Sequence, residues 1–396
     1  MLSERMKKLK PSATVELTAK LEELKRQGID VIKFNVGEPD FDTPINIKTA
    51  AKEAIDSGFT KYTAVPGIFE LRSAICEKLA RDNQVQYSED QIVVSTGAKQ
   101  ALVNALLALI SDGDEVIIPT PCWVSYIDMV TLAGGTPVLF ETKECEGFQL
   151  NLEDLKQVVT EKTKAIMINT PNNPTGATYT YEVLKGLGEL AVEKDFYIIS
   201  DEVYEKLVYE KAEHISIASI SEEIKERTVI VNGMSKGYAM TGWRLGYAAA
   251  ETAVARAMNT IQGHMTSATS AITQKAGLEA LIGDQESVES MRISFDERRK
   301  YAIEKLNSIP GIQCMNATGA FYIMPNVSSY FGKKYGDREI RDSFDLSSYL
   351  LDEARVAVMP GGAFEAPNNL RIAYSNSMIN IIEGLDRMEK VLSKLE

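Results

Sequence analysis

The sequence is poor in the residue types that most often carry metal or nucleophilic chemistry. Its 396 residues include only two histidines, His214 and His264, and four cysteines that show no CxxC spacing. Scattered cysteines of this kind indicate neither a disulfide framework nor a zinc site, and two histidines leave little material for a metal centre or a catalytic triad. We therefore expect no metal, and we expect any catalysis to depend on other groups.

A positive net charge and long apolar runs are missing as well. The 43 basic and 56 acidic residues give a net charge of −13, which opposes binding to nucleic acid or to an anionic membrane surface. The stretch MLSERMKKLKPSATVELTAK has charges but no apolar signal core, and no later segment is suited to cross a bilayer. We predict a cytoplasmic protein with small-molecule partners, in which a few local cations hold any anionic ligand.

The middle of the chain alternates short β-branched runs with helical patterns. This alternation predicts a mostly parallel sheet covered by helices, as in a three-layer α/β/α domain. The predicted strands are 91–95, 115–119, 136–140, 165–169, 196–200, 228–232 and 244–250, and the predicted helices between them include 97–110, 122–132 and 180–194.

The pattern changes beyond about residue 285. A long charged helical segment leads to strands predicted at 319–325, 355–360 and 369–375. A last helix, 378–395, carries apolar residues at helical spacing, including Ile381, Ile382 and Leu385. We therefore predict a large domain at 46–285 and a smaller α+β domain, with an N-terminal arm, formed by residues 1–45 and 286–396.

Polar clusters follow four of the predicted strands. TGAKQ opens a helix at Gly97, where free backbone N–H groups form an anion site. TPNNPTG supplies Asn173, DEVY supplies Asp201 and Tyr204, and GMSK supplies Lys236. Because ligands bind outside the carboxyl ends of the strands in open α/β sheets, we expect these groups to share one site.

Lys236 and Arg244 in NGMSKGYAMTGWRLG indicate what that site binds. A lysine in a partly dry pocket beside other cations loses its proton easily and becomes a nucleophile toward a carbonyl. Arg244 is placed to balance a phosphate at the Gly97 helix terminus. Pyridoxal 5′-phosphate carries an aldehyde and a phosphate, and its electron-sink role needs a carboxylate at the ring nitrogen, for which Asp201 is the candidate.

The motifs TPNNPTG, SDEVY, SK and GWRLG, in this order and spacing, resemble the class I pyridoxal-phosphate aminotransferases of fold type I. The chain looks most like the bacterial aspartate aminotransferase subgroup. The resemblance runs from KPSAT and GEPDFDTP near the N-terminus to the LRIAYS strand, which is nearly the whole chain. It implies an enzyme that transfers amino groups between amino acids and 2-oxo acids by a ping-pong mechanism.

The resemblance implies a role for each residue around the cofactor ring. Lys236 would form the internal aldimine and then move the proton between the substrate's Cα and the cofactor. Asp201 would pair with the ring nitrogen, and Tyr204 and Asn173 with the phenolic oxygen. Trp123 in PTPCWVSY would stack on the ring face.

The same resemblance places a second group of residues at the cofactor phosphate. Gly97, Ala98, Ser235 and Arg244 would face it. Gly233 stands where some relatives have another phosphate-binding serine, so that contact is absent from this sequence.

Tyr62 in TKYTAVPG matches a tyrosine that in the family reaches the cofactor phosphate of the neighbouring subunit, which implies a homodimer with shared active sites. Arg371 in NLRIAYS matches the arginine that holds the substrate's α-carboxylate through a two-pronged contact. Gly37 in GEPD lies in the loop that would close over that substrate, and Trp123 and Asn173 would touch it too.

Two lysines bear on the choice of substrate. Lys99 directly follows the phosphate-binding Gly97 and Ala98, and we predict that it contacts the cofactor as they do. The arrangement TGxKQAL also resembles the subgroup that uses this lysine to engage the distal carboxylate of the substrate. Lys10 in LKPSATV matches a segment associated with a second carboxylate contact, including contact with prephenate in some members. Together they favour L-aspartate as donor and 2-oxoglutarate as acceptor, giving oxaloacetate and L-glutamate.

Plainer interpretations stay open for each feature. Lys236, Lys99 and Lys10 taken singly could be solvated lysines. Arg371 lies inside an apolar predicted strand and could pair with a structural Asp or Glu instead of a ligand. Other reactions on the same scaffold include an aspartate/glutamate–prephenate or broad-specificity aminotransferase and a β-lyase. A cofactor-sensing regulator is disfavoured, because no basic helix-turn-helix segment precedes residue 30 and the charge is acidic.

Overall fold

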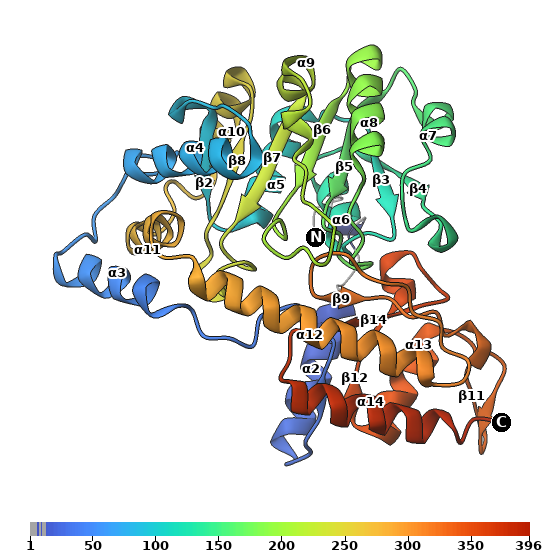
Figure 1. Ribbon diagram of the computed structural model, residues 1–396. Coiled ribbons are helices and arrows are strands. Elements are labelled where there is room, and N and C mark those ends of the chain that lie inside the picture. Colours follow the sequence, from blue (N-terminus) through green and yellow to red (C-terminus); the bar gives the residue numbers. More distant parts are fainter. Residues whose placement is uncertain (1–5, 8, 10–12) are drawn as a thin grey trace.

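The computed structural model describes residues 6, 7, 9 and 13–396, so Lys10 lies outside the described residues. Figure 1 shows a large α/β domain above a smaller one, with helix α12 (Glu286–Ser308) running from beneath the first into the second. Within the described ranges, no helix is both long and apolar enough to cross a membrane.

The large domain is built on a seven-stranded sheet with the order β2-β8-β7-β6-β5-β3-β4. The five neighbouring strands β4, β3, β5, β6 and β7 pair in parallel, whereas β8 is antiparallel to both of its neighbours, β2 and β7. The predicted mostly parallel sheet is therefore confirmed. Its strands are β2 (Ile92–Ser95), β3 (Glu115–Thr120), β4 (Thr136–Glu141), β5 (Thr163–Asn169), β6 (Tyr197–Asp201), β7 (Thr228–Gly233) and β8 (Gly246–Ala249).

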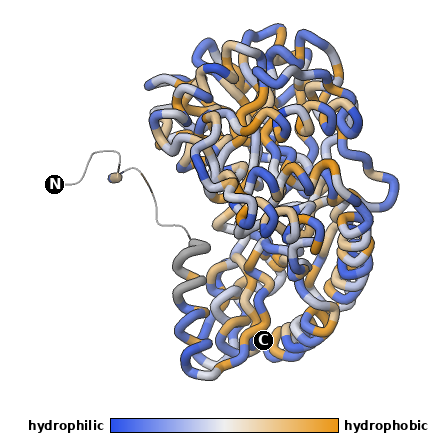
Figure 2. The backbone as a smooth tube through the Cα atoms, turned by 90° about the vertical axis from the view of Figure 1, so that its left-hand side faces the viewer, coloured by the Kyte–Doolittle hydropathy of each residue, from blue (hydrophilic) through white to orange (hydrophobic). Residues whose placement is uncertain are grey.

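Helices cover both faces of this sheet, and Figure 2 shows apolar stretches in orange inside the domain with bluer segments outside. Successive side chains of a strand face opposite sides, so Ile199 packs in one core with α5, α6 and α10, while Ile198 packs in another with α8 and α9. Helix α3 (Ile45–Asp56) lies away from the sheet and packs on α11. The other helices of this part of the chain are α4 (Phe69–Asn83), α5 (Ala98–Leu109), α6 (Ser125–Leu132), α7 (Leu152–Val158), α8 (Tyr181–Lys194), α9 (Glu222–Glu226), α10 (Thr252–Met265) and α11 (Ala271–Ile282).

The small domain joins both ends of the described chain. Its strand β1 pairs in parallel with β12, and β13, β14 and β9 form an antiparallel sheet. The division at residues 45/46 and 285/286 stays a prediction. Its elements are α2 (Ala13–Arg26), β1 (Ile32–Lys33), α12, β9 (Tyr322–Ile323), β10 (Lys334–Tyr335), β11 (Arg338–Glu339), α13 (Ser343–Tyr349), the π-helical turn Leu350–Ala354, β12 (Val356–Ala357), β13 (Met359–Pro360), β14 (Leu370–Ala373) and α14 (Met378–Leu392).

Several predicted boundaries were wrong for local reasons. Arg244 does not begin a strand, because its left-handed backbone (φ 55°) cannot continue into β8. Helix α6 begins later than residue 122, because the Cys122 N–H is bonded to the Phe364 carbonyl of the small domain, at 3.2 Å. The predicted strand 355–360 is split where the carbonyl of Val358 accepts from the Ser347 hydroxyl, at 2.9 Å.

The remaining differences are in length and in the core. The strand predicted at 319–325 is only β9, and α14 ends before residue 395. On α14, Ile381 and Leu385 are buried as the spacing predicts, but Ile382 is exposed because the buried stripe is narrower than the apolar pattern.

Candidate active site

A pocket of about 320 Å³ lies at the carboxyl ends of the parallel strands, between the two domains. Its walls contain most of the residues that the sequence singled out. These are Gly37, Ala98, Lys99, Trp123, Asn173, Asp201, Tyr204, Ser235, Lys236, Arg244 and Arg371.

Lys236 follows β7 and points its amine into this pocket. Its Nζ donates to the carbonyl of Gly37, at 2.5 Å, and lies 5.9 Å from the centre of the Tyr204 ring. Burial lowers the pKa of Lys236 to about 8, with the charges of Arg371 and Arg244 acting in the same direction and Glu38 opposing them. This amine therefore loses its proton at a lower pH than an ordinary lysine, which favours its action as a nucleophile.

Asp201 ends β6 and is buried beside Tyr126. The Tyr126 hydroxyl donates to its Oδ2 at 2.7 Å, and the N–H of Val203 donates to Oδ1 at 3.3 Å. Burial raises the pKa of Asp201 to about 6, while these two hydrogen bonds and the charge of Lys236 act to lower it. A cationic group facing Asp201 would hold the carboxylate charged.

Tyr204 and Asn173 belong to the large-domain wall of the pocket, and each contacts a residue of the small domain. The hydroxyls of Tyr204 and Tyr322 are 3.0 Å apart. Asn173 is fixed by its own N–H, which donates to Asn169 Oδ1 at 2.7 Å. Its Oδ1 accepts from Arg371, which leaves its amide nitrogen to donate into the pocket.

Arg371 on β14 is a buried cation, 5% exposed. Its Nη1 donates to Asn173 Oδ1 at 3.1 Å and its Nη2 to the carbonyl of Asn35 at 2.5 Å, while its Nε has no partner among the described residues. No carboxylate of the described residues forms an ion pair with it, so the structural Asp or Glu that the sequence left open is not found there. A buried guanidinium without an acidic partner favours an anionic ligand.

The start of α5 and Arg244 form the opposite end of the pocket. Gly97 caps this helix at φ 81°, and a Cβ there would collide with Arg244 Nη2. A Cβ on Gly246 would collide with the backbone nitrogen of Ala98. Two glycines thus let a guanidinium and the first N–H groups of a helix approach one point, which suits a phosphate.

Lys99 and Trp123 form the outer wall. Lys99 Nζ lies 4.5 Å from the centre of the Trp123 ring and 3.4 Å from Ser125 Oγ. Burial lowers the pKa of Lys99, and the charge of Arg244 adds to this shift. The amine lies at the pocket mouth and is held there by weak contacts.

Tyr62 is the predicted residue that lies away from the pocket of its own chain. It is 99% exposed and lies beside Ala268 and Ile272. Gly37 lines the pocket, and a Cβ at this position would collide with Tyr322 Oη, so glycine is needed for the loop to pass so close.

Sequence reasoning missed several residues of the pocket. Tyr126 lies three residues after Trp123, and its ring meets the Trp123 ring edge to face, with centroids 5.4 Å apart. This helical spacing was a signal for it. Thr241 lies within NGMSKGYAMTGWRLG and Asn35 lies two residues before Gly37, so both stood next to predicted site residues. Tyr322 comes from a separate segment, and nothing near it in the sequence pointed to the pocket.

Comparisons with known proteins agree with this geometry. The model of the family described as aminotransferase class I and II matches residues 29–387. The chain is 46% identical over 390 residues to an aspartate aminotransferase of Bacillus sp. (strain YM-2), covering 98% of both chains. It is 48% identical over 390 residues to an aspartate/prephenate aminotransferase of Cereibacter sphaeroides, also covering 98% of both.

A solved structure has the same fold along nearly its whole length. The aspartate aminotransferase of Thermus thermophilus with maleate superposes with a TM-score of 0.93, at 42% identity and 99% coverage of both chains.

Proposed function

The chain belongs to the class I and II aminotransferases, which depend on pyridoxal phosphate, and we propose that it moves the amino group of L-aspartate to 2-oxoglutarate in a ping-pong mechanism. The products would be oxaloacetate and L-glutamate. The observation that carries the proposal is the buried Arg371, which has no acidic partner among the described residues and shares a pocket with Lys236.

The residues of the pocket fit pyridoxal phosphate. The Gly97 helix start and Arg244 would hold its phosphate, Trp123 its ring face, and Asp201 its ring nitrogen. Tyr204 and Asn173 would contact its phenolic oxygen, and Ser235, which also lines the pocket, would face its phosphate. The chemistry that this cofactor supplies when bound is an aldehyde carbon and an electron-accepting ring.

Lys236 is the residue that we assign to covalent attachment and to proton transfer. Its lowered pKa, about 8, lets Nζ act as a nucleophile and then accept and return the proton of the substrate's Cα. The Gly37 carbonyl, at 2.5 Å, orients this amine toward the pocket. Asp201 stays anionic beside a protonated ring nitrogen, because the two charges stabilise each other.

Arg371 and Lys99 would bind the two carboxylates of the substrate. The two-pronged guanidinium of Arg371 suits the α-carboxylate, and its unpaired Nε adds a donor. Lys99 at the pocket mouth would engage the distal carboxylate, exchanging its weak contact with Ser125 for an ion pair. The Thermus enzyme was solved with maleate, which is a dicarboxylate, and this supports the preference by analogy.

A homodimer is the assembly that we propose. Tyr62 is almost fully exposed, and so are the apolar side chains of Ile45 and Ile55 on α3 and of Ile282 on α11, two helices that contact each other. Exposed apolar side chains of this kind are common at protein interfaces. In the dimer, Tyr62 would reach the cofactor phosphate of the other subunit. Hybrid dimers that combine Lys236→Ala and Tyr62→Phe subunits would test this, because shared sites leave one of the two sites with both changes and the other with neither.

Prephenate is a second acceptor to consider, since a relative that is 48% identical is named an aspartate/prephenate aminotransferase. The pocket also extends toward apolar residues, Val36, Leu102 and Phe364, which could receive a ring.

Single-turnover half-reactions test the proposal. The cofactor-loaded protein is mixed with aspartate, glutamate, alanine or phenylalanine, and the cofactor absorbance is followed; 2-oxoglutarate or prephenate is then added to restore it. We expect aspartate and glutamate to react fastest and 2-oxoglutarate to restore the spectrum. Release of ammonia, or no reaction with any amino acid, would contradict the proposal.

A further inference from the structure

Asp201 and Glu202 are neighbours in the chain but lie on opposite sides of the central sheet. Asp201 faces the pocket with Tyr126 on the α6 side. Glu202 faces the other side, next to the loop that leads to the buried Ile217, and it is 0% exposed. Successive side chains of an extended strand point to opposite sides of the sheet. Glu202 is therefore a second buried acid, on the side of the sheet opposite to Asp201.

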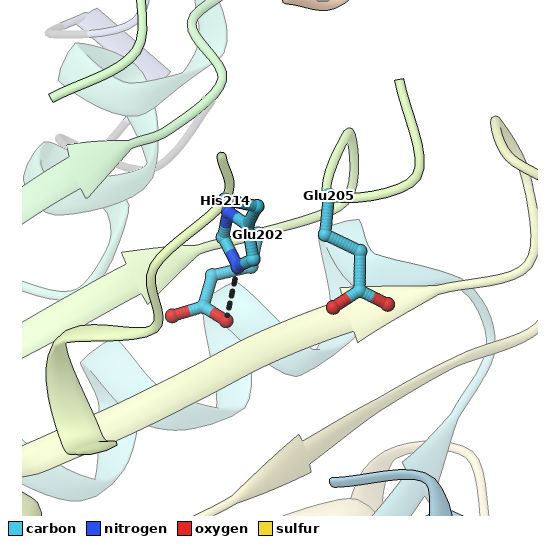
Figure 3. A group of neighbouring side chains, drawn as sticks. All are labelled: Glu202, Glu205 and His214. Atoms are coloured by element: carbon cyan, nitrogen blue, oxygen red, sulfur yellow. Dashed lines mark hydrogen bonds and ion pairs between the residues drawn. The ribbon is translucent and has the colours of Figure 1, made fainter. Parts of the chain in front are cut away.

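Glu202 is held by three donors. Its Oε1 accepts from Ser200 Oγ at 2.9 Å and Ser216 Oγ at 2.8 Å. Its Oε2 accepts from His214 Nε2 at 3.1 Å, the contact drawn as a dashed line in Figure 3. Ser200 precedes Asp201 on β6, so its hydrogen bond to Glu202 helps to fix the end of the strand that carries Asp201. The orientation of the Asp201 carboxylate therefore depends on a contact network outside the pocket.

Glu205, one turn further on, is paired in the same region. It forms an ion pair with Lys78 of α4, and its Oε2 accepts from Asn83 at 3.0 Å. Burial would raise the pKa of Glu205, but the charges of Lys78, His214 and Lys206 outweigh it and lower the pKa to about 2.

Glu202, Glu205 and His214 lie close enough together to suggest metal ligands (Figure 3). However, Glu205 already has an ammonium partner and Glu202 already has three donors. We therefore treat the three side chains as a charge network and not as a metal site.

His214 is the imidazole member of this network. Its side chain is 7% exposed, and its Nδ1 is buried without a hydrogen-bond partner in the part of the chain that the structure describes. Its Nε2 contact with Glu202 therefore fixes the ring against that acid, while Lys78 and Lys206 act on Glu205. Burial is the main reason that the pKa of Asp201 is raised, and the charge of Glu202 adds to it.

We propose that Glu202 and His214 are positioning residues for transamination: they fix the strand end that carries Asp201, and the charge of the pair sets how firmly Asp201 stays anionic against the cofactor's ring nitrogen. This inference rests on the proposed function, because it needs a cofactor at Asp201. The other charged or titratable groups around the network are Lys78 and Asp82 of α4, Tyr87, Glu205, Lys206 and Tyr247.

The test compares the same change at the two histidines of the chain. His214→Gln keeps an N–H donor for Glu202 but removes the imidazole ring, while His264→Gln alters an exposed residue at the end of α10. In cofactor-loaded protein, we expect His214→Gln to move the pH dependence of kcat/KM and of the cofactor absorbance by about half a pH unit. Glu202→Gln should lower kcat/KM about tenfold, and His264→Gln should change neither.

Wild-type protein gives a second measurement that does not depend on the folding of a variant. NMR of carbon-13-labelled histidine should show the rings of His214 and His264, assigned with His264→Gln. We expect the ring signals of His214, and not those of His264, to differ between protein with and without pyridoxal phosphate. If the cofactor binds but the His214 signal and the His214→Gln profile are unchanged, the inference is wrong; if no cofactor binds, the proposed function itself fails.

Discussion

The two walls of the pocket are built in different ways. On the large-domain wall, Asp201, Tyr204, Ser235 and Lys236 come from short motifs that directly follow β6 and β7. On the small-domain wall, Gly37, Tyr322 and Arg371 come from segments far apart in the chain, brought together by β1, β9 and β14. The first wall is a property of local sequence, and the second is a property of tertiary packing.

The walls also differ in charge. The large-domain wall carries both signs, with Asp201 opposite Lys236 and Arg244. The small-domain wall carries the buried Arg371, whose hydrogen bonds go to neutral oxygens of Asn173 and Asn35. A ligand with both positive and negative groups suits the first wall, and a carboxylate suits the second. This difference separates a cofactor side from a substrate side.

The largest expected effect is on the large-domain wall. Lys236→Ala removes both the nucleophile and the proton carrier, so we expect kcat to fall by at least about 10⁴-fold for every amino donor. The cofactor should still bind weakly and without a covalent bond, as dialysis and absorbance would show. Retained turnover would mean that Lys236 is neither the nucleophile nor the proton carrier.

Arg371→Lys tests the small-domain wall. An ammonium cannot reproduce the two-pronged contact, so kcat/KM should fall about 100-fold for all amino acids alike, while the affinity for pyridoxal phosphate stays nearly unchanged. Arg341→Lys, an exposed arginine paired with Asp345, is the matched control. If the variant lost affinity for pyridoxal phosphate by the same factor as it lost activity, the assignment of the small-domain wall to the substrate would be wrong.

Lys99→Ser sharpens the comparison at the pocket mouth. The loss of one charge-assisted contact should lower kcat/KM for aspartate about tenfold more than for alanine or phenylalanine. Lys185→Ser on the exposed face of α8 serves as the control. Equal losses for all three substrates would remove the distal-carboxylate role.

Tyr126→Phe has the smallest expected effect. The pKa of Asp201 is raised to about 6, mainly by burial, and the Tyr126 hydroxyl acts to lower it. Removing that donor should raise this pKa further, so Asp201 loses its charge at a higher pH. The affinity for pyridoxal phosphate should fall about fivefold at pH 6 but by no more than about twofold at pH 8. An equal loss of affinity at the two pH values would contradict this prediction.

The difference between the two walls explains which site residues could be predicted from the sequence. Lys236, Asp201 and Asn173 follow strands with clear β-branched runs, so their meeting at the sheet edge was predictable. Arg371 was identified through a resemblance, but the residues that hold it, Asn35 and Tyr322, depend on contacts between distant segments of the chain.

Other features were beyond local patterns for physical reasons. Glu202 has the same local appearance as Asp201, and only the sheet shows that they face opposite sides. Tyr62 stays outside the pocket of its own chain, so its predicted role needs a partner subunit and stays a prediction.

Reduction with borohydride tests the central claim most directly. Protein loaded with pyridoxal phosphate is reduced, digested and mapped by mass spectrometry. The account predicts one pyridoxyl-modified peptide, with the label on Lys236. A label spread over surface lysines, or confined to Lys99, with Lys236 unmodified, would contradict it.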